Sequence, residues 1–110
     1  MKESELERIL VEEVRKEGGK AYKWVSPGND GVPDRIVFFP GGDVYFVELK
    51  TETGTVSAQQ DIQLKTLARL DQAAMVVRGI KGLIGFFRMA GKDHVADRLE
   101  KRYGMGGDAE

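Results

Sequence analysis

The chain of 110 residues contains no cysteine and a single histidine, His94, which removes several common kinds of site. Without cysteine there are no disulfides and no thiolate metal ligands. With one histidine, a zinc site built from several imidazoles is also excluded. Any metal ion that this chain holds must therefore rest on oxygen ligands, and we expect His94 to be a surface residue.

Long apolar runs are lacking as well. No run reaches the roughly 18–20 residues that a helix needs to span a bilayer. The first ten residues, MKESELERIL, are too charged for a secretory signal. We therefore expect no membrane association and a cytoplasmic location.

The sequence also lacks an excess of charge of either sign. Its 17 Lys and Arg residues nearly balance its 18 Asp and Glu residues, and the net charge is −1. Strong non-specific binding to nucleic acid is therefore not expected. A nuclease is not excluded, because a metal site carries its own positive charge and basic residues can cluster locally. The length fits one domain.

The stretch from Pro33 to Lys50 carries the clearest pattern. Its apolar runs, residues 36–39 and 44–47, are rich in Val, Ile, Tyr and Phe, which is typical of strands. A Pro-Gly-Gly sequence at 40–42 separates the two runs and predicts the turn of an antiparallel hairpin. Folding at this turn brings the two charged ends of the stretch together.

Those ends carry Asp34 on one side and Glu48 and Lys50 on the other. Since strand side chains alternate, Glu48 and Lys50 leave the same face of the sheet, while Leu49 leaves the other. Carboxylate oxygens suit hard divalent cations such as Mg²⁺ or Mn²⁺. A lysine can orient a water molecule or balance the charge of a phosphate. Metal-assisted attack on a phosphodiester requires these parts.

Helical spacing, apolar runs and turn residues predict the remaining elements. The expected helices cover 3–17, 57–72, 83–89 and 94–103, and the expected strands cover 20–26 and 73–78. Ser57 is the expected N-cap of the second helix. Gly79 and Gly82 are expected to loosen the chain after the last strand. The adjacent Phe86 and Phe87 predict either a core contact or a dimer contact.

The pattern Gly31-Val32-Pro33-Asp34 followed by Glu48-Leu49-Lys50 resembles the PD-(D/E)XK nuclease superfamily, and its wording is closest to the VRR-NUC family. The resemblance extends from the first helix to about Met75. It implies an α/β fold with a restriction-endonuclease-like core, in which helices flank a four-stranded mixed sheet. The nuclease domain would cover 1–104, and we expect 105–110 to be a disordered tail.

The resemblance also implies roles for single residues. Asp34 and Glu48 would bind Mg²⁺ or Mn²⁺, with the backbone carbonyl of Leu49 as a third ligand. Lys50 would orient the attacking water and stabilise the phosphate in the transition state.

Two further residues would complete this site. An acidic residue from the first helix joins the metal site in the family pattern, and spacing does not decide between Glu3 and Glu7. Gln60, which follows Ser57 at the family's Ser-x-x spacing, would bind a metal-bound water or a phosphate.

The implied function is a divalent-metal-dependent DNA endonuclease that selects branched DNA, such as Holliday junctions or flaps, in a bacterial or phage-infected cell. Small members of the superfamily often act as homodimers, and we expect a homodimer through the C-terminal half. Two alternatives stay open: a non-catalytic nucleic-acid-binding module, and a nuclease subunit that is active only with a helicase or other partner. The candidate DNA contacts are Lys23, Ser26, Arg35, Lys65 and Arg69.

Overall fold

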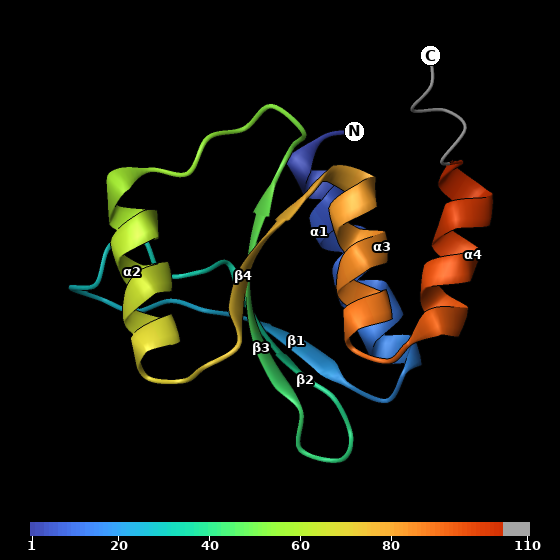
Figure 1. The fold of residues 1–110 in the computed structure, drawn as a ribbon, viewed down its shortest axis with the longest axis horizontal. Coiled ribbons are helices and arrows are strands. Elements are labelled where there is room, and N and C mark those ends of the chain that lie inside the picture. The colour runs from blue at the N-terminus through green and yellow to red at the C-terminus, as the bar shows by residue number, and fades with distance from the viewer. Residues whose placement is uncertain (105–110) are drawn as a thin grey trace.

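A four-stranded mixed sheet with helices on both faces forms the protein in the computed structural model, which describes residues 1–104 (Figure 1). The elements are α1 (Glu3–Lys16), β1 (Lys20–Lys23), β2 (Arg35–Phe38), β3 (Val44–Lys50), α2 (Ala58–Arg69), β4 (Ala74–Arg78), α3 (Gly79–Met89) and α4 (Asp93–Tyr103). The strand order is β1-β2-β3-β4. The first three strands pair antiparallel, and β3 pairs with β4 in parallel. The predicted fold class is confirmed; the predicted tail, 105–110, lies outside the described residues.

Helices α1, α3 and α4 cover one face of the sheet, and the hydrophobic core lies between them and the strands (Figure 1). The apolar stripe of α1 is buried as its spacing predicts. The buried core residues include Leu6, Leu10, Val14, Val37, Val47, Leu49, Val77, Leu83, Phe87, Val95 and Leu99. Among residues 1–104, no helix is long and apolar enough to cross a membrane.

Phe86 and Phe87 belong to this core, with 3% and 0% of their surface exposed. The ring of Phe86 packs against Tyr45, with centroids 5.4 Å apart. Of the two predicted uses, the core contact is therefore the one that the structure contains. The dimer contact loses its basis, because neither ring is available to a partner.

The two glycines after β4 do not loosen the chain, so this prediction is wrong. Helix α3 begins at Gly79 directly after the strand, and Gly82 lies inside the helix. Gly79 has a φ of 58°, and a Cβ there would lie 2.3 Å from the carboxylate of Glu52. The positive φ at this sharp turn from strand to helix favours glycine, since other residues rarely adopt it.

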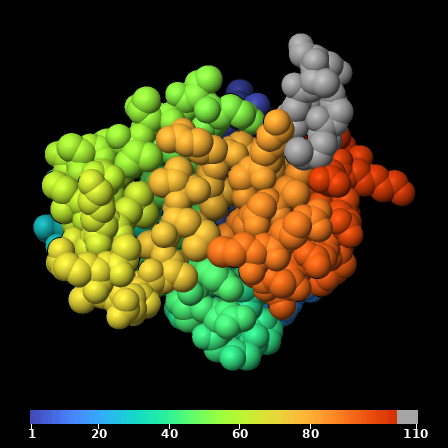
Figure 2. Space-filling model, viewed as in Figure 1, coloured from blue at the N-terminus to red at the C-terminus, as the bar shows by residue number. Residues whose placement is uncertain are grey.

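Helix α2 lies on the opposite side of the sheet from α3 and α4 (Figures 1 and 2). It is shorter than predicted, and none of its residues is buried. Its start has a capping box: the backbone N–H of Gln60 donates to Ser57 Oγ, and the N–H of Ser57 donates to Gln60 Oε1. The N-cap predicted at Ser57 is confirmed.

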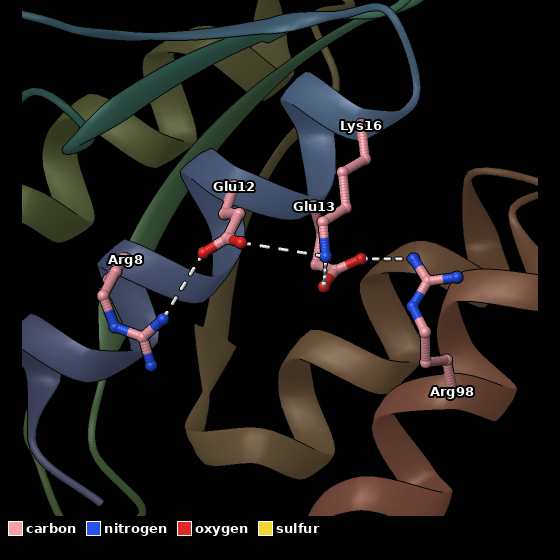
Figure 3. A network of polar contacts seen from close by, with 5 residues as sticks. All are labelled: Arg8, Glu12, Glu13, Lys16 and Arg98. Carbon is pink, nitrogen blue, oxygen red and sulfur yellow. Dashed lines mark hydrogen bonds and ion pairs between the residues drawn. The ribbon is translucent and has the colours of Figure 1, made fainter.

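Helix α4 is tied to α1 by a chain of ion pairs (Figure 3). Glu13 accepts from Arg98 of α4 and lies 3.5 Å from Lys16, while Glu12 lies 3.5 Å from Arg8 and 3.7 Å from Lys16. These contacts hold the last helix along α1. His94 is exposed, as predicted, and its Nε2 lies 2.8 Å from Glu17 Oε1.

Candidate functional site

The open end of the hairpin brings Asp34 to the last residues of β3. The register pairs Arg35 of β2 with Val47, so Asp34 lies beside Glu48 and Leu49. Its Oδ2 accepts a hydrogen bond from the backbone N–H of Leu49 at 2.9 Å. This bond fixes one carboxylate oxygen of Asp34 at the sheet edge and leaves the other oxygen for a further contact.

Glu48 is the buried carboxylate of the site, with 2% of its surface exposed. Its Oε2 accepts from the side-chain amide of Gln60 at 2.8 Å and lies 3.5 Å from Lys50 Nζ. Its Oε1 is buried without a hydrogen-bond partner among the described residues. Buried polar atoms normally have a partner, so this oxygen points to a group that completes the site.

The surroundings of Glu48 disfavour its charge. Burial is the largest cause, followed by the nearby Asp34, and together they raise the pKa of Glu48 to about 7. Lys50 lowers this pKa, and Glu3 raises it. A divalent cation between the carboxylates would reverse the balance, because it stabilises the ionised forms of both.

Glu3 and Glu7 occupy different surroundings. Glu7 Oε2 accepts from Arg35 Nε at 3.0 Å and lies 3.0 Å from Nη2 of the same side chain. Glu3 is the first residue of α1, and its charge contributes to the raised pKa of Glu48. Glu7 is therefore bound by Arg35, whereas Glu3 is one of the charges that act on Glu48.

Gln60 reaches Glu48 because two features hold the start of α2 in place. The capping box orients its side chain, and the loop before Asp34 passes against the backbone of Gln59. Gly31 in this loop has a φ of 87°, and a Cβ there would lie 2.5 Å from the carbonyl carbon of Gln59. The sequence analysis did not predict this contact. Its only sign of a constrained turn was the motif Gly31-Val32-Pro33-Asp34.

The donor set suits a hard cation. Asp34, Glu48 and the carbonyl of Leu49 supply oxygen, the ligand atom that Mg²⁺ and Mn²⁺ prefer. Among residues 1–104 there is no group of three or more acidic, His or Cys side chains at metal-binding spacing. A bound Mg²⁺ would therefore complete its shell with water, as it commonly does. The unpartnered Oε1 of Glu48 fits such an ion.

The candidate DNA contacts fall into two groups. Lys23 is paired with Arg35 in the sheet, one residue from Asp34, and Arg35 is bound by Glu7. The others lie in the loop before the site or on the outer face of α2; they are Ser26, Lys65 and Arg69. Lys65 is held by Asp61 at 2.8 Å.

Comparison with known proteins finds similar proteins both by structure and by sequence. A solved structure described as "VRR_NUC domain" superposes with a TM-score of 0.65 and is 26% identical, covering 70% of this chain and 83% of that one. "Putative nuclease p44" of Acyrthosiphon pisum secondary endosymbiont phage 1 is 58% identical over 50 residues, which are 46% of this chain. The match spans about half (54%) of that relative's length. No family model matches the chain.

Proposed function

Because this chain belongs to the VRR-NUC family of the PD-(D/E)XK nucleases, we propose that it is a divalent-metal-dependent DNA endonuclease that hydrolyses phosphodiester bonds. The observation that carries the proposal is the unpartnered Oε1 of Glu48, a buried carboxylate oxygen beside a second carboxylate, Asp34. Such an arrangement is unfavourable by itself and favourable around a cation.

In the proposed site, Asp34, Glu48 and the backbone carbonyl of Leu49 would hold Mg²⁺ or Mn²⁺. The ion, when bound, supplies Lewis acidity and lowers the pKa of a coordinated water. Glu3 adds negative charge from α1 to the same site, and it is the proposed helix-one acid. Gln60 keeps Glu48 in place through its hydrogen bond to Oε2.

Lys50 supplies the positive charge beside the reaction. Its ammonium lies 3.5 Å from Glu48 Oε2, and 15% of its side chain is exposed, so it borders both the carboxylate and solvent. From there it orients the attacking water and stabilises the negative charge that develops on the phosphate. The proposed reaction forms a bond from water oxygen to phosphorus and breaks the bond to the leaving sugar oxygen.

Branched DNA and a homodimer are the proposed substrate and assembly. A net charge of −1 gives little non-specific affinity for DNA, which favours recognition by shape or by two sites acting together. The dimer contact no longer includes Phe86 and Phe87. Light scattering at micromolar concentration tests the assembly, and a monomer contradicts it.

The experiment incubates the purified chain with linear, flap and four-way junction DNA, in Mg²⁺, in Mn²⁺ and with a chelator. Metal-dependent nicking that Lys50→Ala abolishes supports the proposal, and a preference for junction or flap supports the proposed substrate. Binding without cutting favours the alternative of a non-catalytic module. Cutting that appears only after a helicase or other partner is added favours the partner-dependent subunit.

A further inference from the structure

A second feature lies between α1 and the edge strand β1. A hollow of about 230 Å³ is lined there by four cationic side chains and by no carboxylate; they are Arg15, Lys20, Lys23 and Arg35. Its apolar lining includes Val11 and Ala21. We call this hollow the α1–β1 groove. In a chain with a net charge of −1, four cations around one hollow are a local concentration of positive charge.

Three of these cations are not neutralised by neighbours. Within residues 1–104, Arg15, Lys20 and Lys23 form no ion pair with a carboxylate, and Lys20 lies over the ring of Tyr22 at 5.4 Å. Arg35 differs, because Glu7 binds it.

Other cations of α1 show the usual arrangement. Arg8 and Lys16 are bound by Glu12 and Glu13 (Figure 3). Arg15, Lys20 and Lys23 therefore remain available to an anion without first breaking an ion pair, whereas Arg35 and the cations of the neighbouring helix face do not.

The groove begins beside the proposed active site. Lys23 pairs with Arg35, the residue after Asp34, and the backbone N–H of Trp24 donates to the carbonyl of Asp34 at 3.0 Å. From Lys23 to Lys20 the strand covers about 10 Å. One strand of duplex DNA carries a phosphate about every 3.4 Å of helix axis. Lys20 and Lys23 therefore border the hollow along a length of strand that matches about three phosphate spacings.

We propose that the α1–β1 groove binds the sugar-phosphate backbone of the DNA strand on one side of the cleaved bond. This inference rests on the proposed function and adds Arg15 and Lys20 to its DNA contacts. Arginine binds phosphate with two parallel hydrogen bonds, and lysine binds it as a point charge. Phosphates in the groove would set the position of the scissile bond over Asp34 and Glu48.

The test measures DNA binding in the presence of a chelator, so that it does not depend on cutting. Fluorescence anisotropy with a labelled duplex compares the wild-type chain with Lys20→Gln/Lys23→Gln and with Arg15→Gln at several salt concentrations. The matched control is Lys101→Gln/Arg102→Gln on α4, which removes the same charge elsewhere. All five substituted lysines and arginines are exposed in the folded chain, and melting curves verify that each variant folds.

Weaker binding of the double variant is expected, with a salt slope of log K smaller by about two, because each phosphate contact contributes about 0.9. Arg15→Gln should reduce the slope by about one, and the α4 control should leave it unchanged. The proposal for the α1–β1 groove would be overturned if the double variant and its control lost DNA affinity equally. It would also be overturned if neither lost affinity. Binding of polyglutamate through Lys20 and Lys23 by a chain that does not bind DNA would overturn it as well.

The cutting assay separates this inference from the proposed function. If the wild-type chain nicks DNA and Lys20→Gln/Lys23→Gln binds and nicks equally well, the groove is wrong and the function stands. If the wild-type chain binds DNA through the groove but never cuts, the groove stands and the nuclease assignment falls.

Discussion

Gln60 and Glu48 are joined by a hydrogen bond of 2.8 Å from the amide nitrogen to Oε2, and the other oxygen of that carboxylate has no partner in residues 1–104. Oε2 is thus held by a residue of α2, while Oε1 is buried without a hydrogen bond from the described residues. A carboxylate held in this way is already oriented, so a cation that binds Oε1 does not have to reorder the side chain. This relationship underlies the first three predictions below.

Divalent metal should raise the melting temperature. Burial, and second the nearby Asp34, raise the pKa of Glu48, so the ionised pair is unfavourable without a cation. An ion that binds only the folded state stabilises by mass action, by about 2.7 kcal/mol at one hundred times its dissociation constant. Calorimetry with and without millimolar Mn²⁺ measures the effect, and Glu48→Gln is the control that should lose it. An unchanged melting temperature for the wild-type chain would mean that the site does not bind metal.

Lys50→Ala and Glu48→Gln should both abolish cutting, for different reasons. Glu48→Gln removes charge from the metal site, so Mn²⁺ affinity should fall. Lys50→Ala keeps both carboxylates, so Mn²⁺ should still bind while the rate falls by about 10²–10³, the usual cost of one such electrostatic contact. Titration calorimetry beside nicking of a junction substrate separates the two effects. Wild-type cutting by Lys50→Ala would show that the hairpin end is only structural.

The metal-free protein should lose stability as the pH rises from about 4.5 to about 7. In this range the folded state keeps a proton on Glu48, whose pKa is about 7, while the unfolded chain releases it near the ordinary value of 4.5. The folded state therefore binds more protons, and its advantage, roughly 3 kcal/mol at most, disappears as the pH rises through 7. Urea unfolding with a chelator at several pH values measures this. Glu48→Gln should remove that part of the dependence, and an equal slope in both proteins would contradict the assignment.

Glu3→Gln should weaken Mn²⁺ binding, whereas Glu7→Gln should not. The charge of Glu3 acts on Glu48, while Glu7 is bound by Arg35. Both substitutions remove one negative charge from α1, so each controls for the other. Mn²⁺ titration of the two variants decides between them, and a larger loss in Glu7→Gln would reverse the choice.

Gly31→Ala should destabilise the protein more than Gly28→Ala. Both glycines have positive φ values, 87° and 82°, so an alanine meets the same left-handed backbone cost of about 1–2 kcal/mol at either position. Only at Gly31 would the Cβ meet the backbone of Gln59, whereas nothing lies within 4 Å at Gly28. Urea unfolding measures the difference. Cutting should also fall in Gly31→Ala, because the first turn of α2 positions Gln60; equal stability of the two variants would show that this contact is not tight.

The sheet end could be predicted from sequence because its signals are local. Alternation places Glu48 and Lys50 on one side of the strand, and the turn at 40–42 brings Asp34 toward them. Placing Asp34 beside Glu48 required only the pairing of two strands that are neighbours in sequence. The observed register, with Arg35 opposite Val47, agrees with that placement.

The remaining features depend on contacts between distant parts of the chain. Glu3 and Glu7 lie about one turn apart on the same side of α1, so helical spacing alone does not distinguish them. They differ because Arg35, 28 residues after Glu7, binds Glu7. Phe86 is buried only because Tyr45 and the sheet lie under α3. Gly79 predicts a loose chain from sequence alone, whereas in the structure its positive φ lets α3 begin directly after β4. Periodicity carries no information about such partners.

Helix α2 carries no buried residue; it contacts β4, and its first turn is held by Gln60 and by the loop at Gly31. Segments with little buried apolar surface open at a lower free energy than the core to which they are attached. Local opening of α2 would therefore expose Glu48 without disturbing the packing of α1 and α3. The amide hydrogens of that helix should exchange with solvent before those of the core, and a substrate would reach the proposed site by displacement of this one helix.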